Sequence, residues 1–550
     1  MRNCRIVLIV LEFLYVEGLK PVVEIPSLGV VEGQLDESAN GRSFYSFEGI
    51  PYANPPIGTN RFKEPRYVTP WSGIWKANKK IVCLQYNFFP FSSSNPIEGD
   101  EDCLYLNIYT PKLDGNFSVL VNIHGGSFLF GSGVAARPNL LLDRDIVTVT
   151  FNYRLGALGF LSTEDDTLPG NNGFKDQIMA LRWIKKNIIY FGGDPNSITI
   201  FGTSSGGVCV HFHTMCPKSK DLFNRAISSS GCAMNPWALM RKPLQQTQKL
   251  AVIFNCDFNN TAKMIDCLSE VPGTEIVATV REFQSWEGVP FAPFAMVVDK
   301  WSSDPVLPKH PYKLLSIKSI NDVPWMLSQM AGEGYYNGFK YYDELTLKHL
   351  DTHWNELIPL ILHYNSTISH SDRNYVNQKI RKEYFSDEQI TLQNVRKLIN
   401  MIGDRLFKSD FDKCIRLHAT AIKSQVYHYL FTYRGEFSLS ELYTNGSNKN
   451  FGAVHADDIT YIFQMPNEKT EEDKSMSELL LDIYVSFARD GKPFLQSTWS
   501  PAAKNITKLL NFLNIASPSL LTNERPFSSA IGSFGTLFLF MKMKNFLISC

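Results

Sequence analysis

The feature that most constrains the fold of this 550-residue chain is a serine held between two glycines, with a strand signal before it and a helix signal after it. Residues 202–206 read Gly-Thr-Ser-Ser-Gly, with Ser204 at the centre. The β-branched run 197–201 precedes them and the apolar stretch 206–215 follows. A very tight turn from strand to helix lifts a serine hydroxyl above the sheet, and flanking glycines let the two backbones pass closely. The pattern therefore predicts a strand, a strained turn and a helix, with Ser204 as a candidate nucleophile.

Strand and helix signals alternate along the rest of the chain. The apolar runs 118–125 and 145–153 lack polar alternation, which is typical of central strands covered on both faces. Residues 176–188 place apolar side chains at helical spacing. This order predicts an α/β fold with a large, mostly parallel central sheet and helices on both faces. Further expected elements are a small N-terminal antiparallel hairpin over 21–34, strands over 323–334 and 425–435, and an outer helical region over 337–412 framing a pocket.

The charge balance limits the partners of the protein. Lys plus Arg number 54, and Asp plus Glu also number 54, so the formal net charge is zero. A nucleic-acid binder needs a dominant basic surface, which this composition does not supply. We therefore expect a small, mostly uncharged substrate or a protein partner, and we leave the oligomeric state open.

The two ends of the chain carry segments outside the expected fold. Arg2, Arg5 and the apolar run 6–16 favour a signal peptide over residues 1–18, and hence secretion. Glu12 interrupts this run, and a buried first strand is the alternative. We expect a single domain over residues 19–540 and a C-terminal tail over 541–550. No stable membrane span is expected, since the apolar run 537–541 is far too short to cross a bilayer.

Cysteine spacing also favours export. Of ten cysteines, Cys83 and Cys103 bracket a loop rich in Pro, Ser and Asn, and Cys256 and Cys267 bracket a second loop. Neither pair lies near another at metal-ligand spacing, so disulfides are favoured, although spacing does not determine their connectivity. Five Asn-x-Ser/Thr triplets become candidate glycosylation sites if the chain is secreted, at Asn116, Asn259, Asn365, Asn445 and Asn505.

A glycine-rich turn forms the second candidate element. Residues 122–128, at the end of an expected strand, read Asn-Ile-His-Gly-Gly-Ser-Phe. Backbone N–H groups in such a turn can converge on one point. Together with the N–H of Ser205, they would hold the oxygen that becomes negative when an ester carbonyl is attacked. An ordinary glycine-rich turn is the alternative.

Longer stretches resemble the type-B carboxylesterase, or cholinesterase-like, family. Residues 191–207 and 101–111 resemble its two signatures, and 47–65, 151–163 and 222–231 also match. The resemblance runs from about residue 22 to beyond residue 500, and its overall character is that of the insect esterases. It implies the α/β-hydrolase fold and the activity of a carboxylesterase.

The family pattern implies a role for particular residues. The nucleophile falls on Ser204, the acid on Glu333 in Met-Ala-Gly-Glu-Gly, and the base on His455 in Gly-Ala-Val-His-Ala. Ser, Glu, His is the chain order that this fold uses. The implied disulfides pair Cys83 with Cys103 and Cys256 with Cys267, while Cys414 matches a third family cysteine without a clear partner. The implied oxyanion donors are Gly125, Gly126, Ser127 and Ser205.

Several of these residues have competing interpretations. His211 and His213 rival the proposed base, but two residues apart they point to different sides of a helix, so we expect packing residues. Glu333 can be half of a structural ion pair, yet its place at the end of an apolar strand favours catalysis. Asp457 and Asp458 suggest a metal, but no further ligands converge at metal spacing. We therefore expect solvated or structural carboxylates and no metal.

Three departures from the family pattern bear on the substrate. Thr203 stands where many relatives have Glu and where juvenile hormone esterases typically have Gln, so juvenile hormone is not favoured. No Trp lies between Cys83 and Cys103, where cholinesterases stack a quaternary ammonium, so choline esters are poor candidates. Ser127 replaces a glycine of the oxyanion turn, and its side chain narrows the expected pocket.

Together these features predict a secreted serine carboxylic ester hydrolase that forms an acyl-enzyme and needs no cofactor. The alternative is a catalytically weak or inactive adhesion or binding protein of the same fold, although all three triad positions are filled here. A lipase acting at a membrane surface would need an exposed apolar lid, for which the sequence has no clear amphipathic candidate.

Overall fold

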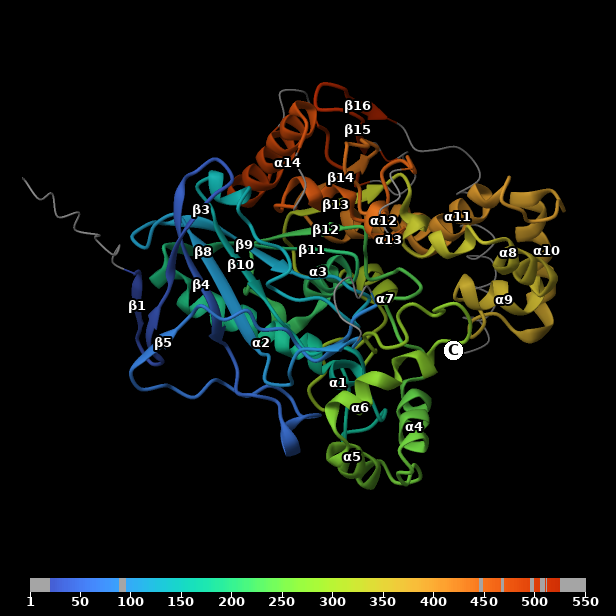
Figure 1. Ribbon diagram of the computed structural model, residues 1–550, viewed down its shortest axis with the longest axis horizontal. Coiled ribbons are helices and arrows are strands. Elements are labelled where there is room, and N and C mark those ends of the chain that lie inside the picture. Colours follow the sequence, from blue (N-terminus) through green and yellow to red (C-terminus); the bar gives the residue numbers. More distant parts are fainter. Residues whose placement is uncertain are drawn as a thin grey trace, which may run out of the picture.

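The computed structural model of the chain describes residues 20–88, 95–444, 449–465, 469–494, 499–504, 510 and 512–524. Its centre is an 11-stranded sheet with helices packed on both faces, as Figure 1 shows. This is the α/β architecture that the alternating signals predict. In order across the sheet the strands are β16 (Leu521–Glu524), β15 (Phe512–Ile515), β14 (Val426–Phe431), β13 (Trp325–Met330), β12 (Arg225–Ser229), β11 (Gly193–Thr203), β9 (Phe117–Ile123), β10 (Val147–Phe151), β8 (Tyr105–Thr110), β4 (Ser43–Pro51) and β3 (Gln34–Glu37).

The sheet is parallel at its centre and antiparallel at its edges. The strands from β10 through β15 in this order pair in parallel. Antiparallel pairs join β10 to β8, β8 to β4, β4 to β3, and β15 to β16. The carboxyl ends of the parallel strands therefore meet at one edge, where α/β proteins bind their ligands.

Two hydrophobic cores cover the two faces of the sheet. Successive strand residues point to opposite faces, so Val121 packs into one core while Leu120 of the same strand packs into the other. The first core includes α2 (Asn172–Asn187) and α3 (Ser205–Met215), and the second includes α14 (Glu471–Asp490). Burial on both faces explains why the central strands are apolar without alternation.

A smaller sheet stands at the start of the chain. β1 (Val22–Ile25) and β2 (Gly29–Glu32) form the antiparallel hairpin that the sequence predicts. A third strand, β5 (Ile74–Lys76), pairs in parallel with β2 and extends the hairpin into a three-stranded sheet. A two-stranded ribbon of β6 (Gln85–Tyr86) and β7 (Ile97–Glu98) pairs with neither of these sheets.

Helices inserted between the strands build the outer part of the molecule. The expected helical region over 337–412 is present and forms the gold and yellow group away from the sheet in Figure 1. It contains α8 (Glu344–Thr352), α9 (Trp354–Ile361), α10 (His370–Phe385), α11 (Val395–Gly403) and the start of α12 (Ser409–Ala421). The remaining α-helices of the described residues are α1 (Gly156–Phe160), α4 (Pro243–Ile253), α5 (Thr261–Glu270), α6 (Gly273–Ala278), α7 (Pro311–Ser316) and α13 (Ser440–Tyr443).

A buried ion pair ties the loop after β10 to α2. The side chains of Arg154 and Asp176 are 4% and 0% exposed, and Nη2 of Arg154 lies 2.6 Å from Oδ1 of Asp176. The backbone N–H and Nε–H of Arg154 donate to Oδ2 of the same carboxylate. Because the carboxylate accepts three hydrogen bonds, the attraction offsets the cost of removing both charges from water.

Candidate active site

Ser204 occupies a strained turn between β11 and α3, as its glycine-flanked motif predicts. Its backbone has φ 60° and ψ −126°, values that few residues with a side chain adopt. The close packing explains the flanking glycine, because a Cβ on Gly206 would lie 2.1 Å from the carbonyl oxygen of Ile123. Ser204 is 8% exposed at the carboxyl edge of the sheet.

Glu333 and His455 form a close buried pair at the same edge. Oε2 of Glu333 lies 2.5 Å from Nδ1 of His455, and the two residues are 0% and 1% exposed. Glu333 begins the 3₁₀ helix Glu333–Asn337 just after β13. The N–H of Gly332 donates to the carbonyl of Ala453, which brings the loop carrying His455 beside it.

The second oxygen of Glu333 is held as firmly as the first. The hydroxyl of Ser230 and the backbone N–H of Met330 each donate to Oε1 at 2.8 Å. An ionised carboxylate only accepts hydrogen bonds, so Nδ1 of His455 carries the proton that it shares with Glu333. The lone pair of the imidazole is then on Nε2, where a base would need it.

Among the described residues Ser204 makes no hydrogen bond to this pair, and residues 229–230 link the two. Nε2 of His455 is buried and makes no hydrogen bond to any residue that the structure describes. The neighbouring segment connects the groups, since the N–H of Ser204 donates to the carbonyl of Ser229 at 2.8 Å and Ser230 donates to Glu333. The structure thus brings Glu333 and His455 into contact and leaves the link from Ser204 to His455 open. Catalytic hydrogen bonds are often long before substrate binds.

The glycine turn packs directly against the serine turn. A Cβ on Gly125 would lie 2.4 Å from the carbonyl oxygen of Thr203 and 3.2 Å from Cβ of Ser204, so only glycine fits there. Within the described chain no acceptor takes a hydrogen bond from the N–H of Gly126 or of Ser127. Ser205 is the first residue of α3, where backbone N–H groups lack a partner inside the helix. Amides with free hydrogens therefore lie beside Ser204.

Tyr336 joins the glycine turn to the imidazole, a contact that the sequence analysis does not anticipate. Its hydroxyl lies 2.6 Å from that of Ser127, and its ring centroid lies 4.8 Å from that of His455. Phe407 packs on the same imidazole at 4.9 Å. Burial raises the pKa of Tyr336 to about 12, so its hydroxyl keeps its proton at neutral pH. The place of Tyr336 three residues after Glu333 is the one sequence signal for it.

Asp457 and Asp458 are structural carboxylates. The sequence leaves open whether they are solvated or structural, and the structure shows the second. Both are buried, and Asp458 accepts hydrogen bonds from the hydroxyls of Ser229, Ser328 and Tyr429. These donors belong to three adjacent strands, so the carboxylate holds their ends together. Asp457 accepts from the backbone of Leu439 and Val454 and from the hydroxyl of Ser438.

The two rival histidines are packing residues. Nδ1 of His213 lies 2.7 Å from the hydroxyl of Ser219, and its Nε2 lies 3.0 Å from Oε1 of Gln177. His211 stacks on Trp325, and its Nε2 lies 3.0 Å from Nδ1 of His418. Burial lowers the pKa of His213 to about 3, so it stays neutral.

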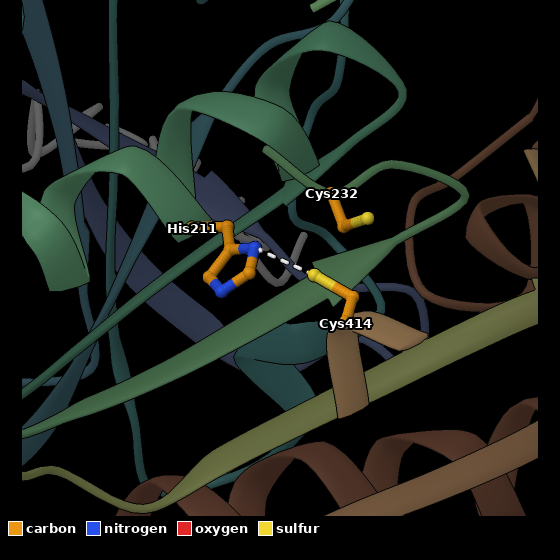
Figure 2. A group of neighbouring side chains, drawn as sticks. All are labelled: His211, Cys232 and Cys414. Atoms are coloured by element: carbon orange, nitrogen blue, oxygen red, sulfur yellow. Dashed lines mark hydrogen bonds between the residues drawn. The ribbon is translucent and has the colours of Figure 1, made fainter. Parts of the chain in front are cut away.

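Cys414 lies beside His211 and Cys232, as Figure 2 shows. One ligand atom from each of the three lies within 4.8 Å of the others. A thiolate–imidazole set of this kind suits zinc. However, Nδ1 of His211 already accepts a hydrogen bond from the N–H of Ala233, and burial raises the pKa of the Cys414 thiol, which therefore stays protonated. The cluster is thus arranged as a packed thiol–imidazole contact, without a disulfide to Cys414.

Both disulfides that the resemblance implies are present. The S–S distance is 2.05 Å for Cys83–Cys103 and 2.02 Å for Cys256–Cys267. Of the five candidate glycosylation sites, Asn116 and Asn259 are exposed and Asn365 is half-buried. Asn445, Asn505, residues 1–18 and residues 541–550 lie outside the described residues. Within the described chain no helix has both the length and the apolar character to cross a membrane.

Comparisons with known proteins place this chain in one family. The model of the carboxylesterase family matches residues 19–525. The chain is 40% identical to venom carboxylesterase-6 of Apis mellifera over 88% of this chain and 90% of that protein. It is 38% identical to esterase FE4 of Myzus persicae, over 96% and 94%, and 35% identical to juvenile hormone esterase of Tribolium castaneum, over 84% and 83%.

A solved structure shows the same fold. The crystal structure of juvenile hormone esterase from Manduca sexta, with OTFP covalently attached, matches with a TM-score of 0.83 at 24% identity. The match covers 95% of this chain and 99% of that chain, which confirms the α/β-hydrolase fold. The chain belongs to the carboxylesterase family, and a relative from Bombus ignitus, 40% identical over 92% of both chains, is named a carboxylic ester hydrolase. The predicted family and enzyme class are therefore confirmed.

Proposed function

We propose that this carboxylesterase works through a Ser204–His455–Glu333 triad and an acyl-enzyme intermediate. The observation that carries the proposal is the buried contact of 2.5 Å between Glu333 and His455, at the sheet edge where the strained Ser204 turn also lies. A carboxylate on Nδ1 selects the tautomer that leaves Nε2 basic, and it stabilises the imidazolium that forms when Nε2 takes a proton.

The reaction then proceeds in two halves. Nε2 of His455 accepts the hydroxyl proton of Ser204 as the serine oxygen attacks the ester carbonyl carbon. The bond from that carbon to the alcohol oxygen breaks, and the alcohol leaves with the proton from His455. Water repeats the sequence on the acyl-enzyme, which releases the acid and restores Ser204.

The free amides beside Ser204 supply the oxyanion hole in this proposal. The N–H groups of Gly126, Ser127 and Ser205 would donate to the carbonyl oxygen as it becomes negative, with Gly125 forming the start of the turn. No acceptor among the described residues binds the N–H of Gly126 or of Ser127, and this supports the role of both groups. One such donor typically contributes about 3 kcal/mol to transition-state stabilisation.

The test is a Ser204→Ala variant compared with Ser475→Ala, which changes an exposed serine on α14. We expect Ser204→Ala to lower kcat for 4-nitrophenyl butyrate by about 10⁴-fold or more and to abolish labelling by a fluorophosphonate probe. Ser475→Ala should leave both unchanged. An unlabelled native protein without ester turnover would instead support the binding-protein alternative, which no observation on the site favours.

We also propose that the chain is secreted as a single domain over 19–540 after removal of residues 1–18, with 541–550 as a tail. Two disulfides and exposed Asn116 and Asn259 support an oxidising, glycosylating route. Expression in insect cells should give a protein in the culture medium that begins at Leu19. Glycosidase treatment should lower its mass by removing glycans from one or more of Asn116, Asn259, Asn365, Asn445 and Asn505. Full-length protein retained inside the cells would overturn this part.

A further inference from the structure

A hollow of about 240 Å³ opens beside the proposed triad. Its wall is rich in aromatic rings, from Phe88, Phe130, Phe291, Tyr336, Phe339 and Tyr443. Such surfaces bind apolar parts of a ligand by removing both from water. The hollow is therefore suited to the body of an ester.

The inner wall of this hollow belongs to the site itself. Tyr336 lines it and contacts both Ser127 and His455. Leu129 and Phe130 also line it, and their N–H groups donate to the carbonyl of Gly126 in the proposed oxyanion turn. A molecule in the hollow therefore lies against residues that position the reacting ester.

The polar part of the hollow is basic. Arg281 and Lys340 both line it, together with the amides of Gln284 and Asn337, and its described lining contains no acidic residue. Among the described residues neither cation has a carboxylate oxygen within 4.0 Å of its nitrogen atoms. Nε of Arg281 donates to the hydroxyl of Tyr86, and Nζ of Lys340 donates to the carbonyl of Glu287.

We propose that Arg281 and Lys340 bind an anionic group at the far end of the ester substrate, so that the preferred substrates are monoesters of dicarboxylic acids or similar esters with a terminal carboxylate. The inference rests on the proposed function and names its substrate class. A guanidinium and an ammonium beside apolar rings would attract a carboxylate more strongly than they would in open water, because the rings exclude solvent. This substrate class departs from the sequence expectation of a mostly uncharged ester, since it carries a charge at one end.

Burial makes the charge of Lys340 sensitive to a bound anion. It lowers the pKa of Lys340 to about 7, while the nearby carboxylate of Glu287 acts in the opposite direction. A bound anion would favour the charged ammonium, because it takes the place of the water that burial removes. The residue therefore gains a charge partner when such a substrate binds.

The experiment compares two esters that differ only at the far end, 4-nitrophenyl hydrogen adipate and 4-nitrophenyl methyl adipate. We expect the native enzyme to favour the anionic ester by about tenfold or more in kcat/KM, mainly through KM, and this preference to fall when NaCl is raised from 20 to 500 mM. In the Arg281→Gln, Lys340→Met double variant the ratio should fall to about one, and Arg281→Glu should reverse it.

The control is the Arg489→Gln, Lys492→Met double variant. It also removes one arginine charge and one lysine charge, but near the amino end of the parallel strands. There Arg225, the first residue of β12, donates to the carbonyl of Arg489. The control should keep the native ratio. Two results would overturn the inference and leave the proposed function standing. One is native enzyme that hydrolyses both esters through Ser204 without preferring the anionic ester. The other is a preference for the anionic ester that survives in the Arg281→Gln, Lys340→Met variant. Turnover of either ester that survives Ser204→Ala would overturn the proposed function instead.

Discussion

The hydroxyl of Tyr336 lies 2.6 Å from the hydroxyl of Ser127, although the two residues are 209 positions apart in the chain. Ser127 replaces a glycine of the family pattern, so this hydrogen bond is a consequence of that departure. The ring of Tyr336 also packs on His455. One side chain therefore touches both the proposed oxyanion turn and the proposed base.

We predict that Tyr336→Phe lowers kcat about fivefold, because the turn loses a hydrogen bond of about 1 kcal/mol that fixes the amide of Ser127. Ser127→Ala should have the same effect through the other partner. The double variant should be no worse than either single variant, since the same bond is lost. Measuring kcat and KM for all four proteins with one ester gives the coupling energy. Strictly additive losses would contradict a shared role.

Glu333→Gln should lower kcat by about 10³- to 10⁴-fold while the protein stays folded. The amide no longer stabilises the imidazolium, and its NH₂ group can favour the wrong tautomer of His455. Its oxygen can still accept from Ser230 and Met330, so we expect the melting temperature to change by only a few degrees. A loss of less than tenfold, in protein with native circular dichroism, would rule out the proposed role.

Acid should destabilise the protein through its buried histidines. Burial lowers the pKa of His428 to about 4, whereas an unfolded histidine has a pKa near 6.5. Between these values the unfolded state binds more protons, so the free energy of unfolding falls as pH drops below about 6.5. His124, His213, His363 and His418 show shifts in the same direction, to pKa values of about 4, 3, 3 and 3.

His428→Leu isolates one of these contributions. Both ring nitrogens of His428 are buried without a hydrogen-bond partner in the described chain, so the variant should be at least as stable as the native protein at pH 7.5. At pH 5 its relative advantage should grow by about 2 kcal/mol, measured by urea unfolding at both pH values. His370→Leu, at an exposed position, serves as the control. An unchanged difference between the two pH values would refute the assignment.

The Arg154–Asp176 pair should be essential for stability. We expect Asp176→Ala to lower the free energy of unfolding by about 3–5 kcal/mol, because it leaves the buried guanidinium without its carboxylate. Glu471→Ala removes the partner of Lys474 in an exposed pair and should cost less than about 1 kcal/mol. Urea unfolding measures both free energies. If the two variants lost similar amounts, the difference in burial would not explain how much each ion pair contributes to stability.

The central fold could be predicted because its signals are local. The strand over 117–123, the helix over 172–187 and the turn at Ser204 follow from apolar runs, helical spacing and glycines within a few residues of each other. Element ends were less accurate: the expected strand over 323–334 ends at Met330, and Glu333 already begins a 3₁₀ helix. The third strand of the small sheet was missed because β5 joins it from 42 residues beyond β2.

The site was predictable only in part. Glu333 and His455 are 122 residues apart, and only the family resemblance pointed to their contact. The Tyr336–Ser127 bond and the basic hollow depend on packing between distant loops, which leaves no periodic pattern in the sequence. Asp458 gave no sign of burial either, since its three hydroxyl partners come from three adjacent strands that are far apart in the sequence.

The proposed triad draws its members from the ends of β11 and β13 and from the loop after β14. A ribosome must therefore synthesise the whole stretch from Ser204 to His455 before all three groups exist together. Nascent forms that end before residue 455 would be hydrolytically silent, so ester turnover would report chains that have passed this point and folded.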